Sequence, residues 1–228
     1  AQDGRPDAAE RALRSALAMH RELGDRGNEA LALHDLGGIA LHRGALGEAE
    51  AALRASIAGL REVGDLRMEA RALGSLGSVL LYDGRAEEAL AVGETALAAH
   101  RSSGSRRGES IALRNLGNVH LGLGRVEAAA DCYDRALQIA GELGDRAEVG
   151  VILGNLGRLH EDAGRATEGR AHFERALAIA REVADPAFEG WLLGRLGRLD
   201  AVDGRVAEAE ARFDAAEALL RAAAHPIG

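Results

Sequence analysis

Hydrophobic positions along this chain recur with a short period and a long one. Over short stretches the apolar residues lie three or four positions apart, as in Leu153, Leu156 and Leu159, which is the spacing of one face of an α-helix. Over longer stretches the whole pattern returns every 40 residues without an insertion or a deletion. The pattern therefore predicts a tandem array of helical repeats. A leucine followed by glycine marks the register five times, at Leu36, Leu76, Leu116, Leu156 and Leu196.

Glycine and aspartate divide each repeat into two helices. One series of glycines follows the first helix of each repeat, where a left-handed residue commonly ends a helix. Its members are Gly44, Gly84, Gly124, Gly164 and Gly204. Before the next first helix stands Gly-Asp or a variant of it, whose polar residue is expected to cap that helix. These caps are Asp25, Asp65, Ser105, Asp145 and Asp185, the last followed by Pro186, which suits a first helical position.

Each repeat therefore holds two predicted helices of about 17 residues. The first helices are predicted at 26–43, 67–83, 107–123, 147–163 and 187–203, the second at 46–62, 86–102, 126–142, 166–182 and 206–223, and a lone second-type helix at 6–22. Neither helix of a pair can bury its apolar stripe alone, whereas stacked pairs bury it continuously. We predict an all-α superhelical solenoid of about five and a half helix-hairpin repeats, with eleven helices, forming one domain over residues 1–228. The repeats span 26–62, 67–102, 107–142, 147–182 and 187–223.

The repeat resembles the tetratricopeptide repeat (TPR) family. The resemblance is carried by Leu153, the pair Leu156-Gly157, Gly169, Phe173 and Ala176, at the spacing of that family's signature. The long 40-residue period is similar to the repeats of Pins/LGN scaffolds, kinesin light chains and the sensor arms of bacterial STAND regulators. The resemblance implies a solenoid whose concave face binds extended peptides through the first helices.

The glycine-rich first helices raise the alternative of a phosphate-binding loop. Such a loop needs a strand before it and a helix start after it, and no strand pattern is present. We instead expect Gly157 at the closest approach of the two helices of a repeat, opposite Gly169. Gly74, Gly154 and Gly194 are not explained in this way. They either let a peptide main chain lie close to the helix or are merely tolerated.

Carrying the family's groove positions onto this chain gives a stripe of candidate ligand-binding residues. The principal candidates are Arg71, Arg114, Asn115, Asn118, Asn155, Arg158, Trp191, Arg195 and Arg198; the same stripe includes Leu31, His34, Asp35, Gly38, His42, Ser75, Ser78, Tyr82, Ile111, Val151, Glu161 and Asp162. Asparagine can bond both polar groups of an extended backbone, arginine grips carboxylates, and Trp191 suits an aromatic anchor. The alternative is a solvated face of weak Arg–Glu pairs, with Trp191 packed on the preceding repeat.

Composition narrows the classes of partner. The formal net charge of −8 argues against nucleic acid as the partner, because phosphate binding needs a clustered excess of Lys and Arg. A single cysteine, Cys132, excludes an intrachain disulfide and suits a reducing cytoplasm. No apolar run is long enough to span a membrane, so no membrane partner is expected.

Candidate chemistry is sparse, and we predict neither an enzyme nor a cofactor or metal site. Cys132 and His172 occupy equivalent positions in successive repeats but lack a third catalytic member. His120 and His160 are likewise equivalent, without the spacing that aims two ligands from one helix at a metal. Histidines near the groove, such as His34, leave open a pH-sensing role.

The ends of the array indicate a larger protein. Glu217 stands where earlier repeats carry leucine or isoleucine, so nothing is expected to stack beyond the last helix. The first helix keeps an apolar stripe, including Leu13 and Leu17, which an upstream segment or a homodimer partner is expected to cover. We therefore predict the C-terminal scaffold or sensor module of a multidomain regulator, which binds an extended, acidic protein segment. The alternatives are a small-molecule sensing arm of a STAND-type regulator and a self-associating or autoinhibitory module.

Overall fold

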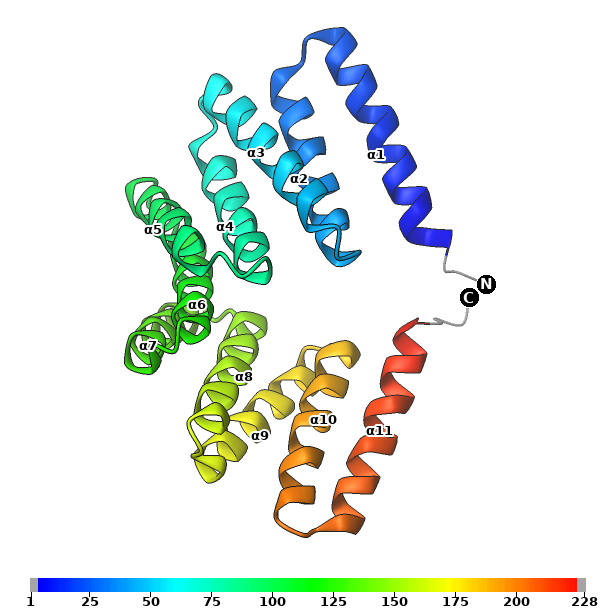
Figure 1. Cartoon of the computed structure of the whole chain (residues 1–228), viewed down its shortest axis with the longest axis vertical. Coiled ribbons are helices and arrows are strands. Elements are labelled where there is room, and N and C mark those ends of the chain that lie inside the picture. The colour runs from blue at the N-terminus through cyan, green and yellow to red at the C-terminus, as the bar shows by residue number, and fades with distance from the viewer. Residues whose placement is uncertain (1–3, 225–228) are drawn as a thin grey trace. The chain divides into compact units, whose positions relative to one another are not determined.

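The computed structural model describes residues 4–224, which are α-helical apart from short turns (Figure 1). The helices are α1 (Gly4–Leu23), α2 (Arg26–His42), α3 (Leu46–Val63), α4 (Leu66–Tyr82), α5 (Ala86–Ser102), α6 (Arg106–Gly122), α7 (Val126–Glu142), α8 (Arg146–Asp162), α9 (Ala166–Glu182), α10 (Pro186–Val202) and α11 (Val206–Ala224). Every predicted helix begins and ends within two residues of the observed one. The all-α repeat architecture with eleven helices is therefore confirmed for the described part of the chain.

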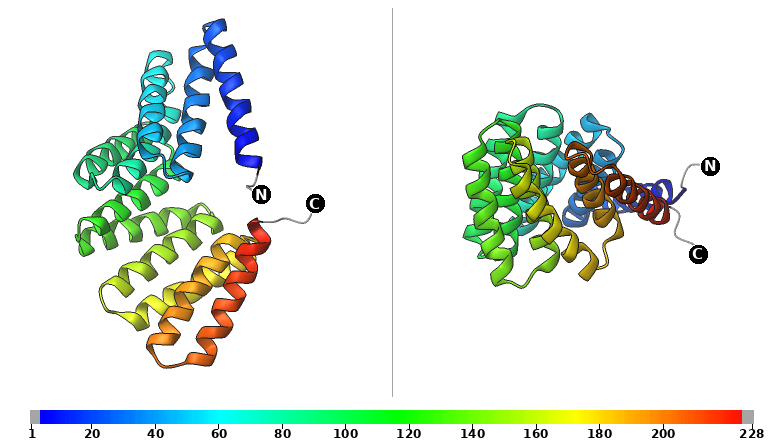
Figure 2. Two further views of the ribbon diagram at one scale, coloured as in Figure 1. Left: turned by 45° about the vertical axis from the view of Figure 1, so that its right-hand side comes forward. Right: turned by 90° about the horizontal axis from the view of Figure 1, so that it is seen from below.

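The helices form two compact units. The first, Ala1–Arg125, contains α1 to α6, and the second, Val126–Gly228, contains α7 to α11. Within each unit every helix packs against the next one in the chain (Figures 1 and 2). In the first unit α4 also contacts both α2 and α6, so the first helices of successive repeats lie side by side.

Local capping sets the helix boundaries. The side chains of all five predicted cap residues accept a hydrogen bond from the backbone N–H three positions on, at 3.1 Å for Asp25 and 2.9 Å for Asp185. The predicted helix-ending glycines all have positive φ, which confirms their role. Ala184, with φ of 54°, is the one described residue other than glycine in this conformation.

Each unit has its own apolar core. In the first unit the core includes Leu53, Leu60, Leu73, Leu76 and Leu80, which are almost inaccessible to solvent. In the second it includes Phe173 with the equally buried Leu153, Leu156, Leu192 and Leu196. These residues belong to the predicted stripes, and the burial of both faces of a hairpin is what holds successive helices together.

At Gly157, the glycine after the register leucine marks a tight approach between the two helices of a hairpin. A Cβ atom on Gly157 would lie 2.5 Å from the ring of Phe173, and one on Gly169 would lie 2.9 Å from the carbonyl oxygen of Gly157. The predicted close approach at Gly157 is thus confirmed. Gly154 has a different explanation from the two offered by the sequence: the rings of Phe188 and Trp191 come within 3.1 and 3.4 Å of the place its Cβ would take.

Candidate ligand-binding groove

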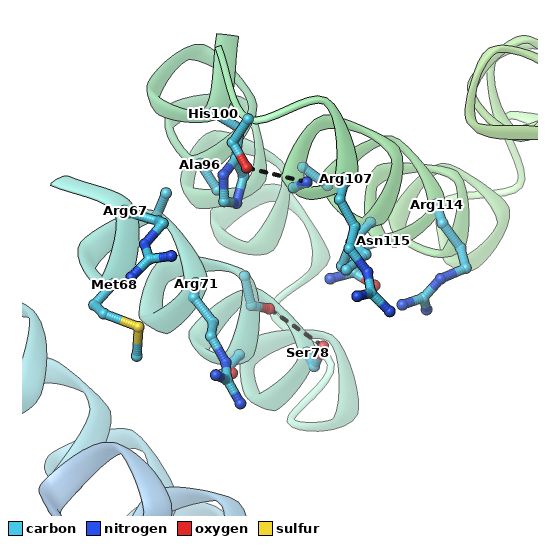
Figure 3. Close-up of a pocket in the computed structure, with 16 residues that line it drawn as sticks. Arg67, Met68, Arg71, Ser78, Ala96, His100, Arg107, Arg114 and Asn115 are labelled. Carbon is cyan, nitrogen blue, oxygen red and sulfur yellow. Dashed lines mark hydrogen bonds between the residues drawn. The ribbon is translucent and has the colours of Figure 1, made fainter. Parts of the chain in front are cut away.

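The first unit contains a groove of about 580 Å³ between α4 and α6, which we call the α4–α6 groove (Figure 3). Its walls are first helices of successive repeats, and α5 contributes Ala96 and His100 between them. A volume of this size is in the range of small-ligand and peptide side-chain pockets. The groove therefore lies along the first helices, whose inner face the family resemblance implied for ligand binding.

The groove is strongly cationic. Four arginines line it, Arg67 and Arg71 from α4 and Arg107 and Arg114 from α6, and no aspartate or glutamate is among the lining residues (Figure 3). Arg67 and Arg71 lie one helical turn apart and have no hydrogen-bond or ion-pair partner among the described residues, whereas Arg107 and Arg114 also interact with other groups of the chain. In a chain of net charge −8, this surface has the opposite sign to the molecule as a whole.

Neutral polar groups accompany the arginines. Ser75, Ser78 and Asn115 line the same groove, and the hydroxyl of Ser78 donates to the carbonyl of Gly74 at 3.3 Å. The amide nitrogen of Asn115 lies 3.6 Å from the place that a Cβ on Gly74 would occupy, so glycine leaves the helix surface bare beside that amide. Neutral donors and acceptors of this kind suit the polar groups of a peptide backbone.

Two buried histidines border the groove. His34 on α2 shares hydrogen bonds with Asp35, at 3.1 Å, and with the hydroxyl of Ser75 on α4, at 3.3 Å, and so links these two helices. His100 is buried against Gly108, where the absence of a side chain makes room for the imidazole ring. Burial lowers the pKa of His100, so the ring is neutral at neutral pH.

Of the principal candidates in the first unit, three line the groove and one does not. Arg71, Arg114 and Asn115 are lining residues. Asn118, nearly one turn further along α6, is half-buried, has interactions of its own and is not among them. The stripe predicted from the sequence therefore contains three of the residues that line the groove.

Among the lining residues that the predicted stripe did not include, three have basic side chains: Arg67, Arg107 and His100. Arg67 and Arg107 stand four positions before Arg71 and Ile111, on the same helical faces, so extending the stripe by one turn toward the N-terminus would have found them. His100 lies on a second helix, and no periodic signal indicated that it reaches the groove.

In the second unit, Arg195 and Arg198 are held by an internal carboxylate. Both guanidinium groups of these α10 residues donate to Glu161 on α8, whose side chain is buried. The hydrogen bonds with Glu161 raise the pKa of Arg198. Asn155 and Arg158 lie half-buried on α8. A ligand carboxylate would therefore have to compete with Glu161 for Arg195 and Arg198.

Trp191 packs on the preceding repeat, which is one of the two roles that the sequence left open. Its ring stacks on Phe188 at 5.7 Å and meets Phe173 edge-on at 6.0 Å, while the guanidinium of Arg195 lies 5.8 Å from its centre. It also packs against Gly154 of the preceding repeat. Even so, 39% of the residue stays exposed, so one edge of this aromatic cluster remains accessible.

The remaining histidine and cysteine candidates show packing rather than chemistry. His160 and His172 stack at 5.1 Å, and His160 accepts a hydrogen bond from Arg165 at 3.0 Å. Cys132 is a buried free thiol, and burial raises its pKa, which disfavours the reactive thiolate. Within residues 4–224 no group of three or more His, Cys, Asp or Glu side chains is placed to hold a metal ion. No helix in this range is long and apolar enough to cross a membrane.

Stacked helix hairpins that present a polar groove along their first helices define a helical-repeat binding scaffold. The chain belongs to the tetratricopeptide repeat family: residues 68–142 and 148–222 match one description of that repeat, and residues 1–65 match another. The family provides scaffolds for protein–protein interaction. No curated protein sequence matches the chain.

Solved structures share the fold at low sequence identity. BtubC (BKLC) from P. vanneervenii is 22% identical with a TM-score of 0.75, covering 99% of this chain and 96% of its own. A Rap protein complexed with competence and sporulation factor is 16% identical with a TM-score of 0.77, covering 98% of this chain and 66% of its own. A putative kinesin light chain of Podospora anserina is 16% identical with a TM-score of 0.61, covering 82% and 92%. The predicted resemblance to the tetratricopeptide repeat family is thereby confirmed.

Proposed function

We propose that this chain is a non-enzymatic binding module that captures an extended, acidic segment of a partner protein in the α4–α6 groove. The observation that carries the proposal is the charge of the groove, which four arginines and no carboxylate line in an otherwise acidic chain. A cationic groove attracts acidic segments over a distance and rejects basic ones. We place the module in the cytoplasm, within a multidomain regulator, and expect neither nucleic acid nor a membrane as its partner.

The lining residues suit an acidic peptide in two ways. Arg71, which has no partner among the described residues, can form a bidentate pair with a side-chain or terminal carboxylate. Asn115 can donate to a backbone carbonyl and accept from a backbone N–H of the same segment. Support for ligand binding by this fold comes from the Rap protein whose structure was solved with competence and sporulation factor.

Candidate contacts outside the α4–α6 groove are proposed for each unit separately. In the first unit this is Asn118 on α6. In the second unit they are Asn155 and Arg158 on α8 and the exposed edge of Trp191. There, Arg195 and Arg198 would bind a ligand only by exchanging Glu161 for its carboxylate, since Glu161 accepts hydrogen bonds from both.

The test is the fluorescence anisotropy of a labelled Glu-rich peptide and its Gln-rich counterpart. The Glu-rich peptide should bind more tightly, and Arg71→Ala should weaken it about tenfold, the loss of one charge-assisted bidentate pair. Arg101→Ala is the matched control, because Arg101 is exposed, pairs with Glu109 and does not line the groove. Equal affinity of the two peptides, or equal effects of the two variants, would contradict the proposal.

A small-molecule effector is the second candidate, and the volume of the groove favours it. About 580 Å³ is enough to enclose a metabolite without a peptide chain. A thermal-shift screen separates the two candidates, because a small effector raises the melting temperature on its own. Ligands that stabilise the wild type but not Arg71→Ala would identify the groove as their site.

Self-association is the third candidate, and it concerns the first helix. α1 exposes two large apolar side chains, Met19 and Leu23. Such side chains at an open end suit a homodimer contact. Light scattering over a range of concentrations tests this, and a concentration-dependent mass that Leu23→Glu abolishes is the expected result.

A further inference from the structure

We propose that the α4–α6 groove recognises a phosphate monoester, with Arg67 and Arg71 as the primary anion-binding residues. The inference rests on the proposed function, because it names the acidic group that the groove selects. A phosphate monoester differs from a carboxylate in carrying up to two negative charges and three acceptor oxygens.

The chain itself shows what one carboxylate takes. Glu29 pairs with Arg21 at 2.9 Å and with Arg26 at 3.0 Å, one carboxylate oxygen to each guanidinium. Glu109 repeats the arrangement with Arg101 and Arg106, at 2.9 Å to both. Two arginines therefore satisfy one carboxylate in this protein.

The α4–α6 groove has more positive charge and more hydrogen-bond donors than one carboxylate needs. Arg67 and Arg71 alone match the demand of a carboxylate, and neither has a partner among the described residues. The amide of Asn115 is a further donor lining the same space, and Arg107 and Arg114, which also interact elsewhere in the chain, add positive charge. A carboxylate has one charge and two oxygens, whereas a phosphate monoester has a charge of about −1.5 to −2 at neutral pH and three strong acceptor oxygens. The phosphate thus uses a third donor and a positive charge that one carboxylate does not need.

The placement of these groups suits a ligand held between two helices. Arg67 and Arg71 extend from α4, while Arg107 and Asn115 lie across the groove on α6 (Figure 3). Arginines on two facing helices can bond an anion that lies between them. Arg67 and Arg71 are the primary anion-binding residues, because Arg107 also interacts elsewhere in the chain.

The groove also has room for the rest of the ester. Its volume of about 580 Å³ is far larger than a phosphate group needs. Apolar lining from Met68, Ile111 and Ala96 stands beside the arginines and can pack against the carbon part of the ligand. The phosphate can belong to a small metabolite or to a phosphorylated side chain, and both present the same group to Arg67 and Arg71.

The first experiment is isothermal titration calorimetry with phenyl phosphate and phenylacetate at equal ionic strength. The two probes share the aromatic ring and differ in the anionic group. Phenyl phosphate should bind at least about tenfold more tightly. The double variant Arg67→Gln/Arg71→Gln should abolish this preference, and both substitutions lie at exposed positions that leave the core intact.

The matched control is Arg61→Gln/Arg101→Gln, which removes the same charge from two exposed arginines outside the groove, paired with Glu69 and Glu109. It should change the affinity for phenyl phosphate by less than about threefold, because only long-range attraction is lost. Equal affinities for the two probes, or a phosphate preference that survives in the groove variant, would overturn the inference. Circular dichroism verifies that all variants remain helical.

A further arm distinguishes the source of the phosphate and separates this inference from the proposed function. A short phosphoserine peptide, its glutamate counterpart and free O-phosphoserine are titrated in parallel. Tighter binding of the phosphopeptide than of free phosphoserine indicates a protein segment, and equal binding indicates a small ester. If the glutamate peptide binds as tightly as the phosphopeptide and both need Arg71, the proposed function stands and the phosphate inference fails. If none of the probes binds, both fail.

Discussion

At the scale of single residues, the glycine after the register leucine has different neighbours in different repeats. At Gly157 the ring of Phe173 fills the space a side chain would need, at 2.5 Å. At Gly77 the nearest atom is the carbonyl oxygen of Ala89, at 3.6 Å, which is an ordinary contact. The difference arises because Gly93 stands where Phe173 stands in its own repeat.

Alanine should therefore have opposite effects at these two glycines. Gly157→Ala overpacks a tight hairpin and should lower the free energy of unfolding by about 1–3 kcal/mol. Gly77→Ala should raise it by about 0.5–1 kcal/mol, because alanine favours a helix interior and has room there. Urea denaturation followed by circular dichroism measures both changes. Effects of the same sign would show that the crowding at Phe173 does not decide the preference for glycine.

Ala184 is strained at the position where the other second helices, α1, α3, α5 and α7, end in glycine. Its φ of 54° lies in the left-handed region, which costs a residue with a Cβ atom about 1 kcal/mol. Ala184→Gly should therefore stabilise the chain by about 1 kcal/mol in thermal or urea denaturation. The reciprocal control is Gly144→Ala at the equivalent position, φ 66°, which should destabilise it by a similar amount. A neutral result at both sites would contradict this explanation.

At the scale of helices, a recurring ion pair spans four of the five junctions between a second helix and the first helix of the next repeat. Arg21 with Glu29, Arg61 with Glu69, Arg101 with Glu109 and Arg181 with Glu189 make it at 2.6–2.9 Å. The fifth junction has Gly141 and Val149 at the two positions and lacks it. The arginine side chains are largely exposed, so each pair contributes about 0–1 kcal/mol and serves orientation more than stability.

A buried carboxylate connects three helices at the end of the second unit. Asp200 on α10 is 1% exposed and pairs with Arg170 on α9 at 2.8 Å, with Arg205 at 2.8 Å and with Arg212 on α11 at 3.1 Å. Burial opposes ionisation of Asp200, but the hydrogen bonds from Arg205 and Arg170 outweigh it and lower its pKa. Earlier repeats carry His120 and His160 at this position, so the sequence pattern did not indicate a buried ion pair.

Removing this charge should loosen the packing of these helices. Asp200→Asn should lower the free energy of unfolding by about 2 kcal/mol, because it leaves partly buried arginines without their counter-charge. Asp203→Asn is the control: Asp203 also bonds Arg170 and Arg205 but is exposed, so its loss should cost less than about 0.5 kcal/mol. Hydrogen exchange of α11 should accelerate in the first variant only. Equal losses in the two variants would show that burial of Asp200 is immaterial.

At the scale of the whole molecule, one buried and three half-buried histidines make stability depend on pH near neutrality. Burial lowers the pKa of His100, His120, His160 and His172 below their usual value of 6.5. The unfolded chain therefore binds more protons than the folded one below about pH 6.5, so stability falls as the pH falls through this region. Carboxylates with lowered pKa, such as Asp200 and Glu50, add a second loss as the pH falls below about 4.5.

Melting temperatures measured between about pH 8 and pH 5 test the histidine contribution. The melting temperature should decline below about pH 6.5, well above the range in which carboxylates titrate. His172→Gln should flatten this decline, because glutamine does not titrate. His42→Gln, at a histidine that is not among the buried ones, should leave it unchanged. A melting temperature that stays constant down to about pH 5 would contradict the assignment.

The sequence by itself determined the features that depend on neighbouring residues along the chain. Capping side chains, left-handed glycines and apolar spacing act within one or two helical turns, so the boundaries of all eleven helices followed from them. The groove stripe followed in part from the family resemblance, whose groove positions include Arg71, Arg114 and Asn115 on the first helices.

Only the tertiary structure decided which arginines remain available. Arg195 and Arg198 occupy the same stripe as Arg71, yet Glu161, more than thirty positions earlier, accepts hydrogen bonds from both. Arg67 and Arg71 meet no such carboxylate among the described residues. All four arginines lie on first helices, but pairing depends on the side chain that the neighbouring helix presents at bonding distance. That contact is set by packing between helices rather than by spacing within one, so the sequence pattern alone did not separate the two groups.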